Sequence, residues 1–161
     1  MSEVGFDACF RAHVGRLIAL GRAVSGDQEL ARDLAQETFL RLHRQWDRLD
    51  DRDEIGGWLT RVMANLLIDH HRSSLAERQA VARLRGRRPE PAAAAEPMVD
   101  SWSQLISGLP PRQRVIVTLH YGQDLSIDEI VRVIEVSNNT VKSALSKART
   151  TLRSQGETDG H

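Results

Sequence analysis

The residues with the clearest chemistry lie near the C-terminus, in a basic segment that contains no acidic side chain. Residues 142–153 carry the cations Lys142, Lys147, Arg149 and Arg153. On a helix that turns about 100° per residue, the apolar residues of this segment form one narrow stripe, made of Val141, Leu145, Ala148 and Leu152. Such a helix packs with one face and offers the other to DNA, because Lys and Arg neutralise phosphates while Lys, Ser and Asn reach base edges.

A second short helix precedes this segment. The run Ser126-Ile127-Asp128-Glu129 has the pattern of a capping box and predicts a helix over Ile127–Ile134. A turn around Glu135-Val136-Ser137 follows, and Ser137 is the expected N-cap of a helix over about 138–153. Periodicity alone equally fits a solvated basic surface helix. The capping box, the short helix and the tight turn together favour a helix-turn-helix that binds DNA.

The N-terminal half carries two more segments with charge on helical spacing. Residues 33–46 alternate acidic, amide and apolar side chains, and from the residues alone they indicate a core helix with a charged outer face. Residues 61–88 contain seven arginines against only Asp69 and Glu77. Local basic segments of this kind suit nucleic-acid binding, although the formal net charge of the chain is zero.

Several other functions are excluded by the pattern. Asp69, His70 and His71 are consecutive, so their side chains diverge on a helix and cannot share one metal ion. The chain contains no Gly-rich phosphate loop, nucleophile motif or paired carboxylates, and we expect no enzyme, metal or cofactor. Cys9 is the one cysteine, which rules out an intrachain disulfide. Without a membrane-length apolar run or a signal peptide, we expect a soluble, cytoplasmic protein with no membrane insertion.

The elements that must position these residues are helical almost throughout. Apolar spacing predicts helices over about 6–18, 29–46 and 53–72 in the first half, and further helices from Trp102 to about Arg153. Residues 87–97, RRPEPAAAAEP, have the composition of a linker. We therefore expect an all-α fold of two small helical domains joined by a flexible linker. The expected boundaries are 1–75 for the first domain, 76–100 for the linker, 101–154 for the second domain and 155–161 for the tail.

The second half also resembles a known family. The segment LPPRQRVIVTLHYGQDLSIDEIVRVIEVSNNTVKSALSKARTTLR looks like the fourth domain of extracytoplasmic-function (ECF) sigma factors, in the sigma-70 family. The resemblance implies that this helix-turn-helix reads the minus-thirty-five promoter element. The residues expected to contact that element are Asn138, Asn139, Thr140, Lys142, Ser143, Ser146, Lys147 and Arg149.

Two segments of the first half resemble the second domain of the same family. DLAQETFLRLHRQW, residues 33–46, is similar to the helix that docks on the clamp of the largest RNA polymerase subunit, and it implies contacts from Asp33, Gln36, Glu37, Phe39, Leu40 and Arg41. WLTRVMANLLIDHHRSS, residues 58–74, resembles the part that opens the minus-ten element, and it implies DNA contacts from Arg61, Asn65, Asp69, His70 and Arg72. Trp58 is expected to anchor the core.

The resemblance predicts a non-catalytic subunit that binds core RNA polymerase and promoter DNA and is controlled by an anti-sigma factor. Three residues depart from the family pattern. Glu135 replaces a glycine in the turn, Val131 replaces a small alanine between the helices, and Ala144 replaces an Arg or His and so removes one possible DNA contact. These departures keep two alternatives open, a stand-alone helix-turn-helix regulator and a sigma-like interaction module without promoter activity.

Overall fold

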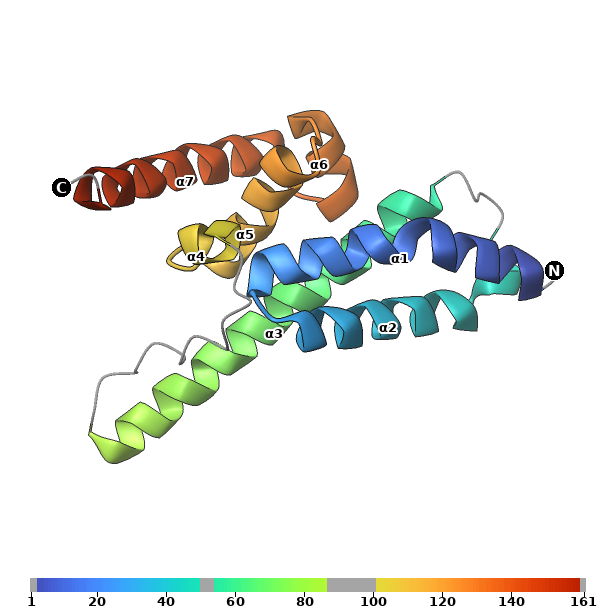
Figure 1. The fold of residues 1–161 in the computed structure, drawn as a ribbon, viewed down its shortest axis with the longest axis horizontal. Helices are drawn as coiled ribbons and strands as arrows, with labels where there is room; N and C mark the ends of the chain where they lie inside the picture. Colours follow the sequence, from blue (N-terminus) through green and yellow to red (C-terminus); the bar gives the residue numbers. More distant parts are fainter. Residues whose placement is uncertain (1–2, 50–53, 87–100, 160–161) are drawn as a thin grey trace.

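The computed structural model describes residues 3–49, 54–86 and 101–159, and every regular element in these ranges is helical (Figure 1). The first half contains α1 (Glu3–Ser25), α2 (Gln28–Arg44), the 3₁₀ turn η1 (Trp46–Arg48) and α3 (Ile55–Arg85). The second half contains α4 (Ser101–Ile106), α5 (Pro111–Val117), the π-helical turn η2 (Thr118–Gly122), α6 (Ile127–Ile134) and α7 (Asn138–Asp159). The predicted all-α fold is confirmed.

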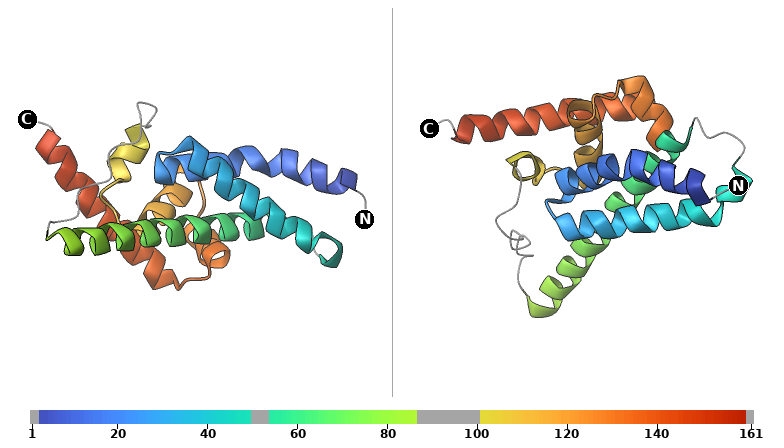
Figure 2. Two further views of the ribbon diagram at one scale, coloured as in Figure 1. Left: turned by 90° about the horizontal axis from the view of Figure 1, so that it is seen from below. Right: turned by 45° about the vertical axis from the view of Figure 1, so that its right-hand side comes forward.

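Helices α1 and α2 lie side by side and antiparallel, and α3 crosses them (Figure 1, Figure 2). The chain reverses at Gly26, whose φ of 71° is readily adopted by glycine, and the Asp27 side chain then caps α2 by accepting a hydrogen bond from the Leu30 amide at 3.1 Å. The side chains that fill the space between the three helices are fully buried: Leu17, Leu20, Leu42, Leu59, Met63 and Leu67. Burial of each contributes about 1.5–3 kcal/mol, and this holds α3 in a fixed orientation.

Helix α3 is longer than the sequence predicts. We expected it to end near Arg72, whereas it continues to Arg85 and is capped by Gly86 in the left-handed conformation at φ 65°. The intervening residues are mostly good helix formers, and the first proline after Trp58 is Pro89. Residues 76–85 of the expected linker are therefore helical, and the linker residues 87–97 lie outside the described ranges.

The second half contains the predicted helix-turn-helix. Ser126 and Glu129 form the predicted capping box, with the Glu129 amide donating to Ser126 Oγ at 3.1 Å. Ser137 caps α7 as predicted, because its Oγ accepts from the Thr140 amide at 3.0 Å. Helix α7 runs to Asp159, beyond the expected end near Arg153. The core of this half is made of Ile106, Val115, Ile116, Leu119, Ile130, Val141, Leu145 and Ala148.

The two halves pack directly against each other, which the sequence did not predict. Helix α3 contacts both α5 and α6, while α1 contacts α4, α5 and η2. Their buried residues form one continuous apolar cluster. Polar contacts cross the same seam, since Gln123 Nε2 donates to the Arg16 carbonyl at 3.1 Å and Arg61 pairs with Glu135 at 2.6 Å. Helix α7 lies on the far side of α5 and α6 from this seam (Figure 1).

The hydropathy of the described helices excludes a membrane-spanning role for any of them, because none is both long and apolar enough.

The close packing of α1 on α2 and α3 gives a direct test of the first core. A Cβ at Gly21 would lie 2.7 Å from Met63 Cε and 2.8 Å from Ala31 Cβ, whereas one at Gly15 would meet nothing within 4 Å. We expect Gly21→Ala to destabilise the protein by about 1–3 kcal/mol through overpacking. Gly15→Ala on the same helix should stabilise it by up to about 1 kcal/mol. Urea unfolding measures both changes, and equal stabilisation by the two variants would contradict this packing.

Candidate nucleic-acid interface

Helix α7 presents the basic face that the sequence predicts. Its packed stripe is buried at Val141, Leu145 and Ala148, against α5 and α6. Most of the residues expected to read the minus-thirty-five element are exposed, namely Asn139, Lys142, Ser143, Ser146, Lys147 and Arg149. Asn138 and Thr140 are half-buried at the first turn, where the Thr140 hydroxyl lies 2.7 Å from Ser137 Oγ. The structure therefore groups the cations and hydroxyls on one accessible surface, with the first-turn residues serving the helix cap.

The three departures from the family pattern have different structural consequences. Glu135 adopts the left-handed conformation, with φ 56° and ψ 49°, so the turn keeps the geometry that glycine favours although the residue is not glycine. Val131 is half-buried against the core. Ala144 is only 6% exposed, because it lies on the packed face of α7. The expectation that Ala144 removes one possible DNA contact stays a prediction.

On α3, four of the five residues expected at the minus-ten element fall on one side of the helix, and His70 lies on the opposite side from Arg61. Arg61, Asn65, Asp69 and Arg72 follow each other at spacings of four, four and three residues, which places them in one row. Asn65, Asp69, His70 and Arg72 are exposed. Arg61 differs from them, because its Nη1 donates to Glu135 Oε1 in the turn between α6 and α7.

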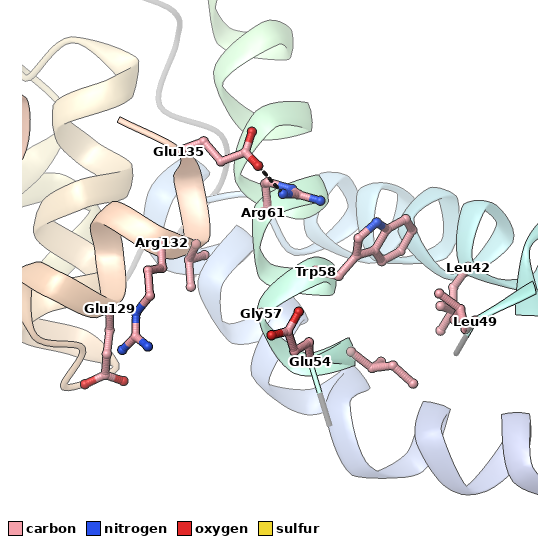
Figure 3. A pocket seen from close by; sticks show the side chains of 11 residues that line it. Leu42, Leu49, Glu54, Gly57, Trp58, Arg61, Glu129, Arg132 and Glu135 are labelled. Carbon is pink, nitrogen blue, oxygen red and sulfur yellow. Dashed lines mark hydrogen bonds and ion pairs between the residues drawn. The ribbon is translucent and has the colours of Figure 1, made fainter. Parts of the chain in front are cut away.

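This ion pair closes one side of a cleft of about 750 Å³ between α2, α3 and α6 (Figure 3). The cleft has an apolar floor formed by Leu42, Leu49, Ile55, Trp58 and Val133. Its rim carries the charged side chains Glu54, Arg61, Glu129, Arg132 and Glu135. Trp58 packs against the core, as expected, but its indole also lines the cleft beside Arg61. No local sequence pattern indicates this cleft, because its two walls are far apart in the chain.

The outer face of α2 has the mixed character expected of a protein-docking helix. Asp33, Gln36, Leu40 and Arg41 are exposed, and Arg41 Nε donates to the half-buried Glu37 at 3.1 Å. Phe39 is only 4% exposed, with its ring centroid 4.8 Å from that of Phe10. Phe39 therefore forms part of the wall of a groove and does not project from the surface toward a partner. This groove, of about 580 Å³, is mainly apolar and is lined by Phe6, Phe10, Val14, Ile18, Ala35, Phe39 and Leu40 together with Arg32, Gln36 and His43.

A cluster of cations lies where α3 meets α5. His71 Nδ1 donates to the Leu67 carbonyl at 2.8 Å, and Arg114 donates to the Leu109 and Ser107 carbonyls, each at 2.7 Å. Burial lowers the pKa of His71 despite the Leu67 bond, and the nearby cations Arg114, His70 and Arg78 lower it further. Burial also lowers the pKa of Arg114. The neutral imidazole is therefore the form that this seam favours.

Within the described ranges, no group of three or more His, Cys, Asp or Glu side chains comes together as a metal site. The arrangement offers surfaces for macromolecules, with charge and hydrogen-bonding groups on α3 and α7 and an apolar groove on α1 and α2.

Comparison with known proteins matches both halves. Residues 9–77 match the family described as sigma-70 region 2, and residues 100–152 match sigma-70 region 4. The chain is 30% identical over 159 residues to the ECF RNA polymerase sigma factor SigM of Mycobacterium tuberculosis, covering 91% of this chain and 74% of SigM. It is 28% identical over 144 residues to the ECF RNA polymerase sigma factor SigW of Bacillus subtilis, covering 81% of this chain and 77% of SigW.

The fold is similar to a solved structure that covers both halves together. The sigma factor RpoE of Bartonella quintana, crystallised in complex with the anti-sigma factor NepR, matches with a TM-score of 0.67 and 19% sequence identity. The match covers 93% of this chain and 95% of that one, so the likeness extends across both helical units.

The lowered pKa of His71 predicts an acid-sensitive fold. Because the folded state favours the neutral imidazole, the stabilisation is present above the ordinary histidine pKa and is lost as the pH falls below it. We expect the melting temperature to fall between pH 7.5 and pH 5.5, and to fall less in His71→Gln. The exposed His43→Gln should behave as wild type. Equal pH dependence in wild type and His71→Gln would contradict a buried neutral His71.

Proposed function

This chain belongs to the ECF group of RNA polymerase sigma factors, and on that basis we propose that it binds core RNA polymerase and directs transcription initiation at particular promoters. The observation that carries the proposal is the presence, in one chain, of two separate accessible surfaces whose groups could bind DNA, the basic face of α7 and the row of polar residues on α3. A regulator that binds DNA by itself needs only the first. The two family matches support proposed functional domains at 1–75 and 101–154.

The basic face of α7 suits the major groove. From Asn139 to Arg149 it is about 15 Å long, which covers roughly four base pairs at 3.4 Å each. Lys142, Ser143 and Ser146 would face base edges, while Lys147 and Arg149 would bind phosphates. The amides of the first turn, near Asn138 and Thr140, would favour a further phosphate. In this proposal α7 reads the minus-thirty-five element.

The row on α3 suits the minus-ten element. An exposed amide such as that of Asn65 can both donate to and accept from the edge of a splayed base, and Arg61 and Arg72 would bind the backbone. Asp69 offers a further hydrogen-bonding group in the same row, and the exposed His70 would contact DNA from another side of the helix. Helix α2 and its apolar groove would dock on the polymerase clamp, through charge steering by Asp33 and Arg41 and burial of Leu40.

The packing of the two halves implies that the chain opens when it reads a promoter. Glu135 touches Arg61 at 2.6 Å, and Asn138 follows Glu135 by at most roughly 11 Å of chain. Allowing about 12 Å for the two side chains, α7 begins within roughly 25 Å of Arg61, and the stretch from Asn138 to Arg149 adds only about 17 Å. Two promoter elements about two turns of DNA apart are separated by roughly 70 Å. The packed arrangement is therefore too short, and the α3 seam has to separate.

We also propose that an anti-sigma factor controls this chain by covering surfaces that polymerase uses. The fold likeness to RpoE in its complex with NepR supports this partner class, and the apolar groove of α1 and α2 offers a surface for an amphipathic helix.

Polymerase binding is tested by placing a charge in the groove. Leu40 is 45% exposed at the groove, so Leu40→Asp should leave the fold intact and weaken binding to core RNA polymerase about tenfold or more. Ala12→Asp places the same charge on an exposed position of α1 that does not line the groove, and it should bind as wild type. Pull-down or fluorescence titration with core enzyme measures both. Equal binding by the two variants would contradict the role of α2.

DNA reading is tested on α7. Lys142→Ala combined with Ser146→Ala should abolish promoter-specific transcripts, because it removes a charged contact and a hydroxyl from the base-reading face, while polymerase binding is unchanged. Gln104→Ala, at an exposed position of α4, is the control. The assay is transcription of genomic DNA by reconstituted polymerase with mapping of transcript starts. Transcripts that persist at the same starts would contradict the assignment, and an absence of new transcripts with wild type would favour a stand-alone regulator.

A further inference from the structure

The turn residue Glu135 combines two features that neither helix explains. Its backbone lies in the left-handed region, at φ 56° and ψ 49°, which L-residues with a side chain adopt at a cost. Its carboxylate reaches out of the turn and accepts a hydrogen bond from Arg61 Nη1 at 2.6 Å. The two residues are 74 positions apart in the chain, so the pair joins α3 to the helix-turn-helix.

The partner of Glu135 is a residue that the proposed promoter complex needs. Arg61 begins the row on α3 that continues through Asn65 and Asp69 to Arg72, and it is the only member of that row for which an ion pair is recorded among the described residues. A carboxylate oxygen bound to a guanidinium occupies the same donors that a DNA phosphate would use. Trp58 lines the same cleft, with its indole on the side of Arg61 away from Glu135 (Figure 3).

We propose that Glu135 is an internal phosphate mimic, which occupies Arg61 in the free chain and must be displaced before α3 can bind promoter DNA. The inference rests on the proposed function, because it takes Arg61 to be a DNA contact. It deepens that function by naming a contact through which the helix-turn-helix masks the minus-ten surface. The exposed face of α7 stays accessible, so the masking acts on one of the two DNA-facing surfaces.

The strained backbone and the ion pair act on different equilibria. The left-handed turn belongs to the helix-turn-helix itself, and it is present whether or not that unit lies against α3. The energetic cost of the left-handed turn therefore lowers the stability of the folded chain. It favours neither the closed arrangement, in which the helix-turn-helix packs against α3, nor the open one. The ion pair exists only when the seam is closed, so of these two effects only the ion pair favours the closed arrangement, in addition to the apolar packing across the seam. A glycine at 135 would remove both effects, whereas a glutamine would remove only the charge.

The strength of this contact is suited to a mask that has to be removed. The Glu135 side chain is 68% exposed and that of Arg61 is 32% exposed, so solvent and salt screen the pair. An ion pair at such a site shifts an equilibrium by no more than about fivefold. The free energy of binding several DNA phosphates, or of binding polymerase, exceeds the free energy of this ion pair. Higher salt weakens the ion pair further.

The direct test is the chemical reactivity of Arg61. Phenylglyoxal modifies accessible guanidiniums, and mass spectrometry of the digested full-length chain reports each arginine separately. The exposed Arg72 on the same helix serves as the internal reference. We expect Arg61 to react about two- to fivefold faster, relative to Arg72, in both Glu135→Gln and Glu135→Gly than in wild type. The glycine variant removes the backbone strain of the turn. It therefore still tests the proposal if the glutamine variant folds poorly.

Glu129→Gln is the matched control. Glu129 lies on α6 and lines the same cleft. The substitution removes the same charge as Glu135→Gln, and glutamine preserves the capping box with Ser126. Its Arg61 should react as in wild type. Unchanged Arg61 reactivity in the two Glu135 variants would overturn the proposal, and so would an equal increase in Glu129→Gln, which would indicate a general charge effect of the cleft.

A second measurement separates the mask from the proposed function. Binding of a fluorescent mixed-sequence single-stranded oligonucleotide to the free chain should be about two- to fivefold tighter in Glu135→Gln than in wild type, and no tighter in Glu129→Gln. Equal affinity in Glu135→Gln and wild type would overturn the mimicry. The proposed function fails on a different result, namely no transcripts from the wild-type chain with core polymerase, whatever the reactivity of Arg61.

Discussion

The structure depends on the packing of α3, which is shared between the two halves of the chain. One side of α3 completes the core with α1 and α2 through Leu59, Met63 and Leu67, and its contacts with α5 and α6 join it to the helix-turn-helix. The remaining surface holds the polar row that we assign to the minus-ten element. Because α3 serves both purposes, DNA binding and packing against the second half use neighbouring surfaces of the same helix. The two interactions therefore compete.

The local parts of this architecture could be predicted from the sequence, because short-range chemistry determines them. The capping box at Ser126 and Glu129 and the N-cap at Ser137 depend on residues within one helical turn, and both are present as predicted. At Glu135 the family pattern has glycine, which implied strain or a changed turn, and the structure keeps the left-handed conformation. The exposed face of α7 followed from its period of 3.6 residues.

The remaining features depend on contacts between distant segments, which no local pattern encodes. The ion pair of Arg61 with Glu135 spans 74 residues, and the lowered pKa of His71 depends on Arg114 from the other half. The packing of α7 on α5 and α6 buries Ala144, which its position in the family pattern does not indicate. Helix α3 passed its expected end at Arg72 because the next residues favour helix and nothing stops it before Gly86.

The central claim is that the packed chain is the resting form of a sigma factor that opens on polymerase. The most direct measurement is the distance between spin labels at Glu54→Cys, just before α3, and Arg132→Cys on α6, two exposed positions that line the cleft between the halves, in a Cys9→Ala background, by pulsed electron paramagnetic resonance. The free chain should give a single short distance, and core RNA polymerase should shift the distribution to markedly longer values. The same short distance in a demonstrated complex with polymerase would contradict the account.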